Sequence, residues 1–430
     1  MGRPSRGRPA VESGPHLRPR VVRWARHRLS VAKGKPLASN ALAEVCWAFL
    51  KLGLTSFGGP IAHLGYIRAE CVEKRRWLGE DEYADTVALC QFLPGPSSSQ
   101  VVFALGMHRA GLLGAIGASA AFLLPSAMLM IAFAYSVGAM GDLHGAGWLH
   151  GLKLAAVGVV AQAVWAMGLK LCPDRPRFTI AVAATAMTLF VPGAPGQVAA
   201  LAGGALVGFV LYRHVPPPPK PDTVARARSH LAAVVALVAF ALLLVVPRIL
   251  ASTTDDRSIA LFDGFYRPGA LVFGGGHVVL PLLREALVPR GWLSDDAFLA
   301  GYGAAQAVPG PMFSLAGYLG AVIEGGRHAW LGGLWCLFAI FLPSWLLIAG
   351  ALPFWHQLRA KAWMQAAMRG TNAAVVGILL SALYTPVITE GVKTSRDVAA
   401  ALVAFALLES WKVPPWAVVL LSAAAGQWVL

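Results

Sequence analysis

Residues 49–60 read FLKLGLTSFGGP, an apolar segment with two glycines and a proline near its end. A similar segment, FYRPGALVFGGG, occupies residues 265–276. An α-helix is interrupted at such residues, because proline lacks an N–H group and glycine has no side chain to favour the helix. Interrupted backbone at membrane depth is tolerated only where it is buried in protein or lines a watery cavity. The sequence therefore predicts two broken helices at equivalent places.

The repeat extends well beyond these two segments. The region from about residue 49 to 169 reappears from about residue 265 to 383, with matching positions 215 to 219 residues apart. Because the matching Gly, Pro and Trp residues keep their order, we infer an internal duplication. The shared landmarks are Phe57-Gly58-Gly59 and Phe273-Gly274-Gly275, Trp77 and Trp292, Pro94-Gly95-Pro96 and Pro309-Gly310-Pro311, and Leu124-Pro125-Ser126 and Leu342-Pro343-Ser344.

The composition indicates that the lipid bilayer surrounds this chain. Of its 430 residues, 57% are hydrophobic and 13% are charged, against about 45–50% and about 25% in soluble domains. Apolar runs such as residues 115–137 approach the roughly 20 residues that a helix needs to cross the hydrocarbon core. The net charge of +15 comes largely from the N-terminal tail and connecting loops, which indicates membrane topology and no nucleic-acid partner.

Each half contains six apolar segments, and one more segment lies between the halves. Six segments return the chain to the side that it left, so one extra crossing would present the second half to the membrane upside down. We therefore expect an all-α polytopic membrane protein with two inverted-topology repeats. Its expected parts are a disordered basic tail (1–40), a first membrane repeat (41–213), a cytoplasmic Pro-rich linker (214–229), a connecting transmembrane helix (230–252) and a second membrane repeat (264–430).

The charges of the loops give the expected orientation. The basic tail and linker should be cytoplasmic, and an acidic loop that includes Asp256 and Asp263 should lie outside. The basic loop from Arg68 to Asp85 disagrees, because it would lie outside if the first segment crossed fully. Two interpretations remain open. Either the first two segments of each half enter the membrane and turn back at their Gly and Pro motifs, or they span it and the loop acids mask the charge bias.

We expect the transported solute to bind where these segments are broken. The start of a helix carries about half a positive charge and unpaired N–H groups, which suit an anion. Hydroxyl and amide side chains add donors without a full charge. A packing notch or a kink is the structural alternative for each motif taken alone. The candidates are Thr55, Gly58, Gly59, Pro60, Gln91, Pro94, Gly95, Pro96, Ser99 and Gln100 in the first half, and Gly274, Gly275, Gly276, His277, Gln306, Pro309, Gly310, Pro311 and Ser314 in the second.

Two basic residues complete the candidate substrate site. Lys51 precedes the first glycine motif, and Arg267 occupies the matching place in the second half. Ionisable residues inside membrane segments suggest a function. Snorkelling toward headgroups is the alternative, which we favour for the other matched pair, Arg68 and Arg284. His63 and His277 flank the glycine motifs and could accept protons near pH 7, although we favour a structural polar contact for each.

In combination, these motifs resemble the chromate ion transporter family. The resemblance rests on residues 49–60, 91–100, 269–277 and 306–311 and covers most of the chain after about residue 40. It implies the long, two-domain form of that family, in which duplicated halves are thought to face opposite ways. It also implies export of chromate from the cytoplasm, driven by the membrane potential or the proton gradient, and chromate resistance. The Arg-rich tail departs from the family pattern.

The resemblance implies a multi-pass protein of the bacterial inner membrane with a cytoplasmic N-terminus. Its expected partner is chromate, with sulfate as a mimic, and no cofactor is expected; a homodimer stays open. Sulfate or molybdate transport is the alternative among transporters, because tetrahedral oxyanions differ little in size. A membrane-embedded enzyme is the alternative of another class. The sequence lacks a His-Glu-x-x-His, a Gly-x-Ser-x-Gly and a Gly-x-x-x-x-Gly-Lys motif, so we expect neither an enzyme of these types nor an ATP-driven pump.

Overall fold

A computed structural model describes residues 41–56, 59–140, 147–192, 194–214, 230–272, 278–355 and 361–428, together with Gly2. Within the unit from Leu42 to Leu430, every regular element in these described ranges is helical. Six of the described helices are long and apolar enough to cross a membrane. The predicted all-α polytopic membrane fold is therefore confirmed.

The helices of the two halves correspond in order. The first half contains α2 (Ala41–Thr55), α3 (Gly59–Arg68), the π-helix η1 (Ala69–Lys74), α4 (Glu80–Phe92), α5 (Ser97–Met140), α6 (Gly147–Leu171), α7 (Arg175–Phe190) and α8 (Ala194–Tyr212). After the connecting helix α9 (His230–Thr253), the second half contains α10 (Arg257–Leu271), α11 (Val279–Leu287), α12 (Asp295–Ala307), the 3-10 helix η3 (Met312–Ser314), α13 (Leu315–Glu324), α14 (Ala329–Ala351), α16 (Ala362–Ala382), the π-helix η4 (Leu383–Ile388), α17 (Thr389–Gly391), α18 (Ser395–Glu409) and α19 (Pro415–Trp428).

Local signals set the ends of these helices. The backbone leaves the helical region at Ala110 and Gly111, so α5 is two consecutive helices, as the separate apolar segments predict. The carboxylate of Asp256 accepts hydrogen bonds from two N–H groups of the first turn of α10, which therefore starts earlier than the apolar pattern predicts. The expectation that Asp263 lies in an acidic loop is wrong. Asp263 is buried inside α10, where it faces Arg248 and Arg290 at 3.4 and 3.5 Å.

The first two segments of the first half turn back at their Gly and Pro motifs. Glu44, near the start of α2, pairs with Arg75 after η1 at 3.3 Å and with Arg109 at the end of the first helix of α5 at 2.8 Å. The indole N–H of Trp77 donates to the same carboxylate at 3.0 Å. These contacts hold the bases of two helical hairpins together. With 15 residues, α2 is only about 22 Å long, shorter than the roughly 30 Å hydrocarbon core. The geometry favours the interpretation with segments that enter and return.

The second half forms the same two hairpins. Arg290, which follows α11, reaches back to the Ala260 carbonyl and lies 3.5 Å from Asp263, both near the start of α10. Arg257 at the start of α10 donates to the carbonyl oxygen of Ile323 at the end of α13. The start of α10 therefore meets the far ends of both hairpins, as the start of α2 does in the first half.

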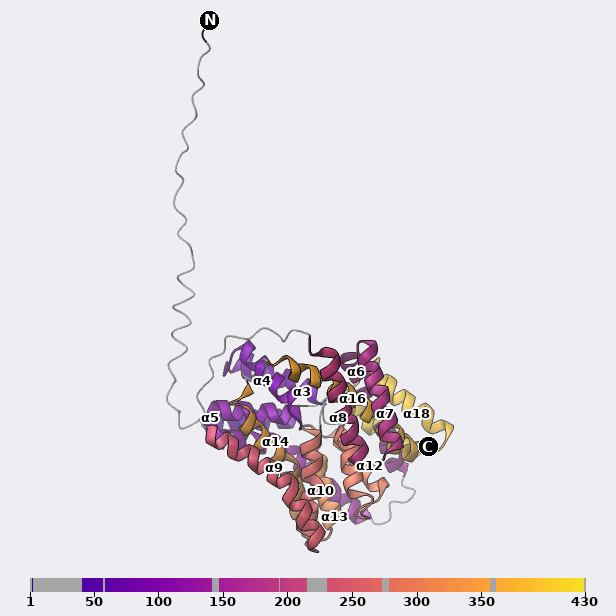
Figure 1. The fold of residues 1–430 in the computed structure, drawn as a ribbon. Coiled ribbons are helices and arrows are strands. Elements are labelled where there is room, and N and C mark those ends of the chain that lie inside the picture. Colours follow the sequence, from indigo (N-terminus) through magenta and orange to yellow (C-terminus); the bar gives the residue numbers. More distant parts are fainter. Residues whose placement is uncertain are drawn as a thin grey trace. The chain divides into compact units, whose positions relative to one another are not determined.

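Helices of each half pack against helices of the other half. Helix α6 of the first half packs against α18 and α19 of the second, and α16 of the second half packs against α7 and α8 of the first (Figure 1). The crossings are close: a Cβ atom added to Gly370 of α16 would overlap the carbonyl oxygen of Gly204 in α8. The matching residue Gly151 of α6 lies equally close to Ser422 of α19. Small residues permit such close approach of helix backbones in membranes.

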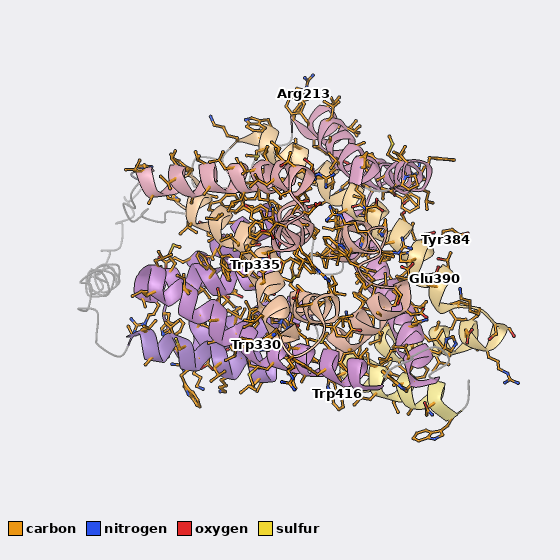
Figure 2. The ribbon with its side chains drawn as sticks, turned by 90° about the horizontal axis from the view of Figure 1, so that it is seen from below. Arg213, Trp330, Trp335, Tyr384, Glu390 and Trp416 are labelled. Carbon is orange, nitrogen blue, oxygen red and sulfur yellow. The ribbon has the colours of Figure 1, made fainter. Side chains whose placement is uncertain are left out.

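Apolar side chains cover much of the outside of the helices. The connecting helix α9 exposes Leu231, Val235 and Ile249, among other large apolar residues. Such a helix would be unfavourable in water, but it suits contact with lipid. Arg213 at the end of α8 is exposed and points away from the helices at the edge of the view in Figure 2. The chain is thus a multi-pass membrane protein whose apolar exterior faces the acyl chains.

Replacing Gly370 by Ala should destabilise the protein, because the new methyl group would force α8 and α16 apart. Overpacking of this kind typically costs about 1–3 kcal/mol. The melting temperature of the purified protein in detergent measures the loss. Gly203→Ala is the matched control, because an added Cβ at this neighbouring position of α8 has no atom within 4 Å. Equal melting temperatures of the two variants would contradict the close crossing.

Candidate functional site

The interrupted segments of the two halves meet each other. Gly95, in the first Pro-Gly-Pro motif, donates its N–H group to the carbonyl oxygen of Val272 at 2.7 Å, just before the second glycine motif. In return, Gly310 of the second Pro-Gly-Pro motif donates to the carbonyl oxygen of Ser56 at 2.8 Å, just before the first glycine motif. Because these four residues are two matched pairs in the duplicated sequence, the contacts are reciprocal. We call the place formed by Ser56, Gly95, Val272 and Gly310 the junction.

Side chains from the long helices reach the two glycines of the junction. A Cβ atom added to Gly95 would overlap the Oγ atom of Ser344 in α14 and would lie 2.6 Å from Nε2 of Gln100 in α5. A Cβ atom added to Gly310 would lie 3.0 Å from Oγ of Ser126 in α5. Both glycines also have positive φ angles, 124° and 104°, which disfavour other residues. Bare backbone therefore faces hydroxyl and amide groups here.

Several of these buried polar groups have no hydrogen-bond partner within the described residues. They are the hydroxyl groups of Ser56, Ser99 and Ser344 and the carbonyl oxygen of the Gln100 side chain. The Gln100 amide nitrogen donates a hydrogen bond to the carbonyl oxygen of Pro94 at 2.7 Å. A buried polar group without a partner costs about 1–3 kcal/mol. The unpartnered groups of Ser344 and Gln100 beside Gly95, and the hydroxyl group of Ser56, whose carbonyl binds Gly310, are therefore suited to bind water or a polar solute.

Helices of both halves begin at the junction. In the first half α3 starts at Gly59 and α5 at Ser97, and in the second half η3 follows Pro311. The first N–H groups of a helix have no partner within it, and the start of a helix carries a partial positive charge. Helices α2 and α10 end at the same place, but the carbonyl groups of Ser56 and Val272 are occupied by the glycine N–H groups. The remaining free backbone groups of these helix starts are donors.

The two matched basic residues have different surroundings. The ammonium group of Lys51 lies 3.8 Å from Glu70, and 48% of its side chain is exposed. Arg267 lies in the last part of α10, is half-buried, and forms no ion pair with any residue in the described ranges. Where the first half has Glu70, the second half has Ala286. Arg267 therefore lacks the carboxylate that neutralises Lys51.

The other matched arginines have ion pairs at the bases of the hairpins. The guanidinium group of Arg68 binds Glu80 at the start of α4, and that of Arg284 binds Asp295 at the start of α12 at 2.6 Å. The structure thus gives both residues a fixed carboxylate partner in place of the expected snorkelling. Both ion pairs hold equivalent turns of the two halves in place.

The remaining predicted residues fall into three groups. Thr55 and Gln91 are exposed, and the hydroxyl group of Thr55 donates to its own helix at the carbonyl of Lys51. Gln306 contacts the sulfur of Met312, and Ser314 is buried in η3. Pro60 stands in the first turn of α3, and the prolines Pro94, Pro96, Pro309 and Pro311 flank the junction glycines. Gly58, Gly274, Gly275, Gly276 and His277 lie outside the described residues.

Ser56 of the junction, and Ser126 and Ser344 beside its glycines, are not among the site residues predicted from the sequence. Ser126 and Ser344 belong to the matched Leu-Pro-Ser landmarks, so the repeat marks them, but a serine after proline inside a long apolar helix is easily taken for a helix kink. Ser56 precedes the first glycine motif. The recurrence of Leu-Pro-Ser at equivalent places was the signal that could have found two of them.

Comparison with known sequences agrees with the repeat and with its chemistry. The profile of the family described as Chromate transporter matches residues 43–209 and again residues 259–427. A protein of Synechococcus elongatus named probable chromate transport protein is 29% identical over 396 residues, 90% of this chain and 95% of that protein. The chromate transport proteins of Pseudomonas aeruginosa and Cupriavidus metallidurans are 28% and 27% identical over 77% and 80% of this chain and 77% and 82% of their own. No solved structure matches. This chain therefore belongs to the chromate transporter family.

Proposed function

We propose that this protein carries chromate across the bacterial inner membrane, out of the cytoplasm, driven by the membrane potential or the proton gradient. The junction is the observation that carries the proposal, because the backbones of both halves meet there and the buried hydroxyl groups of Ser56 and Ser344 have no partner within the described residues. Relatives named chromate transport proteins along most of the chain support chromate as the solute. Export of this toxic anion would give the cell chromate resistance.

The chemistry of the junction suits a doubly charged oxyanion. A dianion that leaves water must exchange its hydration shell for hydrogen-bond donors and must find at least one positive charge. The hydroxyl groups of Ser56, Ser99 and Ser344 and the helix starts supply the donors. Arg267 supplies a positive charge that no described carboxylate neutralises, whereas Lys51 shares its charge with Glu70. Tetrahedral sulfate presents the same charge and oxygen atoms, so we expect it to compete with chromate.

The reciprocal contacts suggest how access to the junction alternates. We propose that the two halves are inverted in the membrane, with the N-terminus in the cytoplasm and the hairpin bases of the two halves on opposite sides. Equivalent elements could then exchange conformations, so that the junction opens first to one side and then to the other. The bases closed by Glu44 with Arg75 and by Asp263 with Arg290 are the candidate gates.

Replacing Arg267 by Gln should reduce chromate flux more than replacing Lys51 by Gln. Loss of a hydrogen bond to a charged group costs about 1.5–3 kcal/mol, which corresponds to a roughly 10- to 100-fold weaker binding. Chromate flux into proteoliposomes under an imposed membrane potential measures the effect. Arg213→Gln, which removes the same charge from an exposed position, is the control and should transport normally. Normal flux in Arg267→Gln would exclude Arg267 as the countercharge.

A methyl group at the junction should block transport. Gly95→Ala would fill the space between Ser344 and Gln100 and would also strain a backbone with φ of 124°. Gly111→Ala is the matched control: its φ of 67° is also positive, but no atom lies within 4 Å of an added Cβ. We expect chromate flux to be lost in Gly95→Ala and retained in Gly111→Ala at equal membrane levels. Equal flux in the two variants would show that the space at the junction is not used.

A further inference from the structure

His63 is a buried titratable side chain that the proposed transport cycle has not yet used. It lies in α3, about one turn after this helix leaves the junction. Its side chain is 1% exposed, and neither ring nitrogen has a hydrogen-bond partner in the described part of the chain. The ring packs edge-on against Phe122 of α5, with 5.8 Å between ring centroids. The expected structural polar contact of His63 stays a prediction, and a buried imidazole without a hydrogen-bond partner in the described residues needs a reason.

The position of His63 connects it with the contact between the two halves. Helix α3, which carries His63, begins at Gly59, three residues after Ser56. The carbonyl oxygen of Ser56 accepts the N–H of Gly310, and its hydroxyl group has no partner within the described residues. A proton on His63 would thus lie at the first-half side of the junction.

No described residue forms a hydrogen bond or an ion pair with the ring of His63. Helix α3 packs against η1 and α5, and α4 touches it through a hydrogen bond to the carbonyl of Leu64. Most of the described titratable groups of these elements and of α2 form ion pairs or hydrogen bonds with partners other than His63, largely at the hairpin base. They are Glu44, Lys51, Arg68, Glu70, Glu73, Lys74, Glu80, Glu82, Tyr83, Asp85, Arg109 and Tyr135. The others are Cys46, Tyr66, Cys71, Cys90 and His108, and none of them bonds to the ring of His63.

We propose that His63 takes up a proton when an oxyanion dianion binds at the junction. The inference rests on the proposed function. Burial favours the neutral imidazole in the empty carrier, and a nearby dianion favours the imidazolium. Arg267 balances one of the two negative charges, and Lys51 is already paired with Glu70. An imidazolium at His63 would balance the second negative charge. The loaded site would then be nearly neutral before it opens to the other side of the membrane.

This proton site belongs to the first half. The position that matches His63 is Val279, which is fully buried in α11 and cannot titrate. The two halves therefore divide the charges between them: the second half contributes the permanent charge of Arg267, and the first half contributes a charge that appears only with the anion. Binding of one dianion would then be accompanied by the uptake of about one proton.

Proton uptake on chromate binding tests this inference with the purified full-length protein. Isothermal titration of potassium chromate at pH 8 in two buffers of different ionisation enthalpy gives the number of protons taken up. At this pH the imidazole starts neutral, so a gain of up to about one proton per bound chromate is expected. His63→Gln and His63→Leu should bind chromate more weakly and take up no proton. The Leu variant guards against misfolding, because an apolar side chain suits a pocket without hydrogen-bond partners.

His328→Gln serves as the matched control, since His328 is exposed and makes no capping bond at the start of α14. This variant should take up the same number of protons as the unaltered protein. The inference is overturned if both His63 variants still take up the proton, if the unaltered protein binds chromate without proton uptake, or if His277→Gln abolishes the uptake and the His63 variants do not. Failure of the unaltered protein to bind chromate would instead contradict the proposed function.

Discussion

Backbone groups that leave a helix inside a membrane need partners, because the hydrocarbon core offers no water to replace the lost hydrogen bonds. In this protein α2 and α10 end just before the Gly-Gly motifs, and a backbone carbonyl next to each of these ends binds the Pro-Gly-Pro motif of the other half. The N–H of Gly95 binds the carbonyl of Val272, and the N–H of Gly310 binds that of Ser56. Neither half could complete this arrangement alone. The same dependence holds for whole helices: α6 of the first half packs against helices of the second half, and α16 of the second half packs against helices of the first.

The family's oxyanion chemistry fits this constraint. Once the interrupted backbones have satisfied one another, the groups left over are mainly donors: serine hydroxyl groups and the first N–H groups of helices. A site built in this way carries little charge of its own. A single unpaired guanidinium group, Arg267, then has a large influence on which ions are attracted. In the proposed mechanism, the duplicated fold provides the symmetry for alternating access, and the differences between the halves provide the charges.

Much of the fold could be predicted from the sequence, because duplication and helix-breaking motifs are local patterns. The segments, the connecting helix and the breaks all follow from apolar runs, glycine and proline. The predicted start of α10 was wrong because a capping side chain sets it. Asp256 caps the helix, which therefore begins earlier and contains Asp263. The re-entrant hairpins could be suspected from the basic loop after Arg68, but only the contacts of Glu44 distinguish them from full spans.

The motifs that meet at the junction could be predicted from the sequence, but the pairing of their neighbouring side chains could not. Matched motifs identify Gly95 and Gly310, but sequence spacing cannot show that Lys51 is paired with Glu70 while Arg267 is not. The position of bound chromate, located by the anomalous scattering of chromium in crystals of the complex, would decide whether the junction is the binding site. We predict the chromium peak beside the hydroxyl groups of Ser56 and Ser344. A peak confined to the arginines at the hairpin bases, with the junction empty, would contradict it.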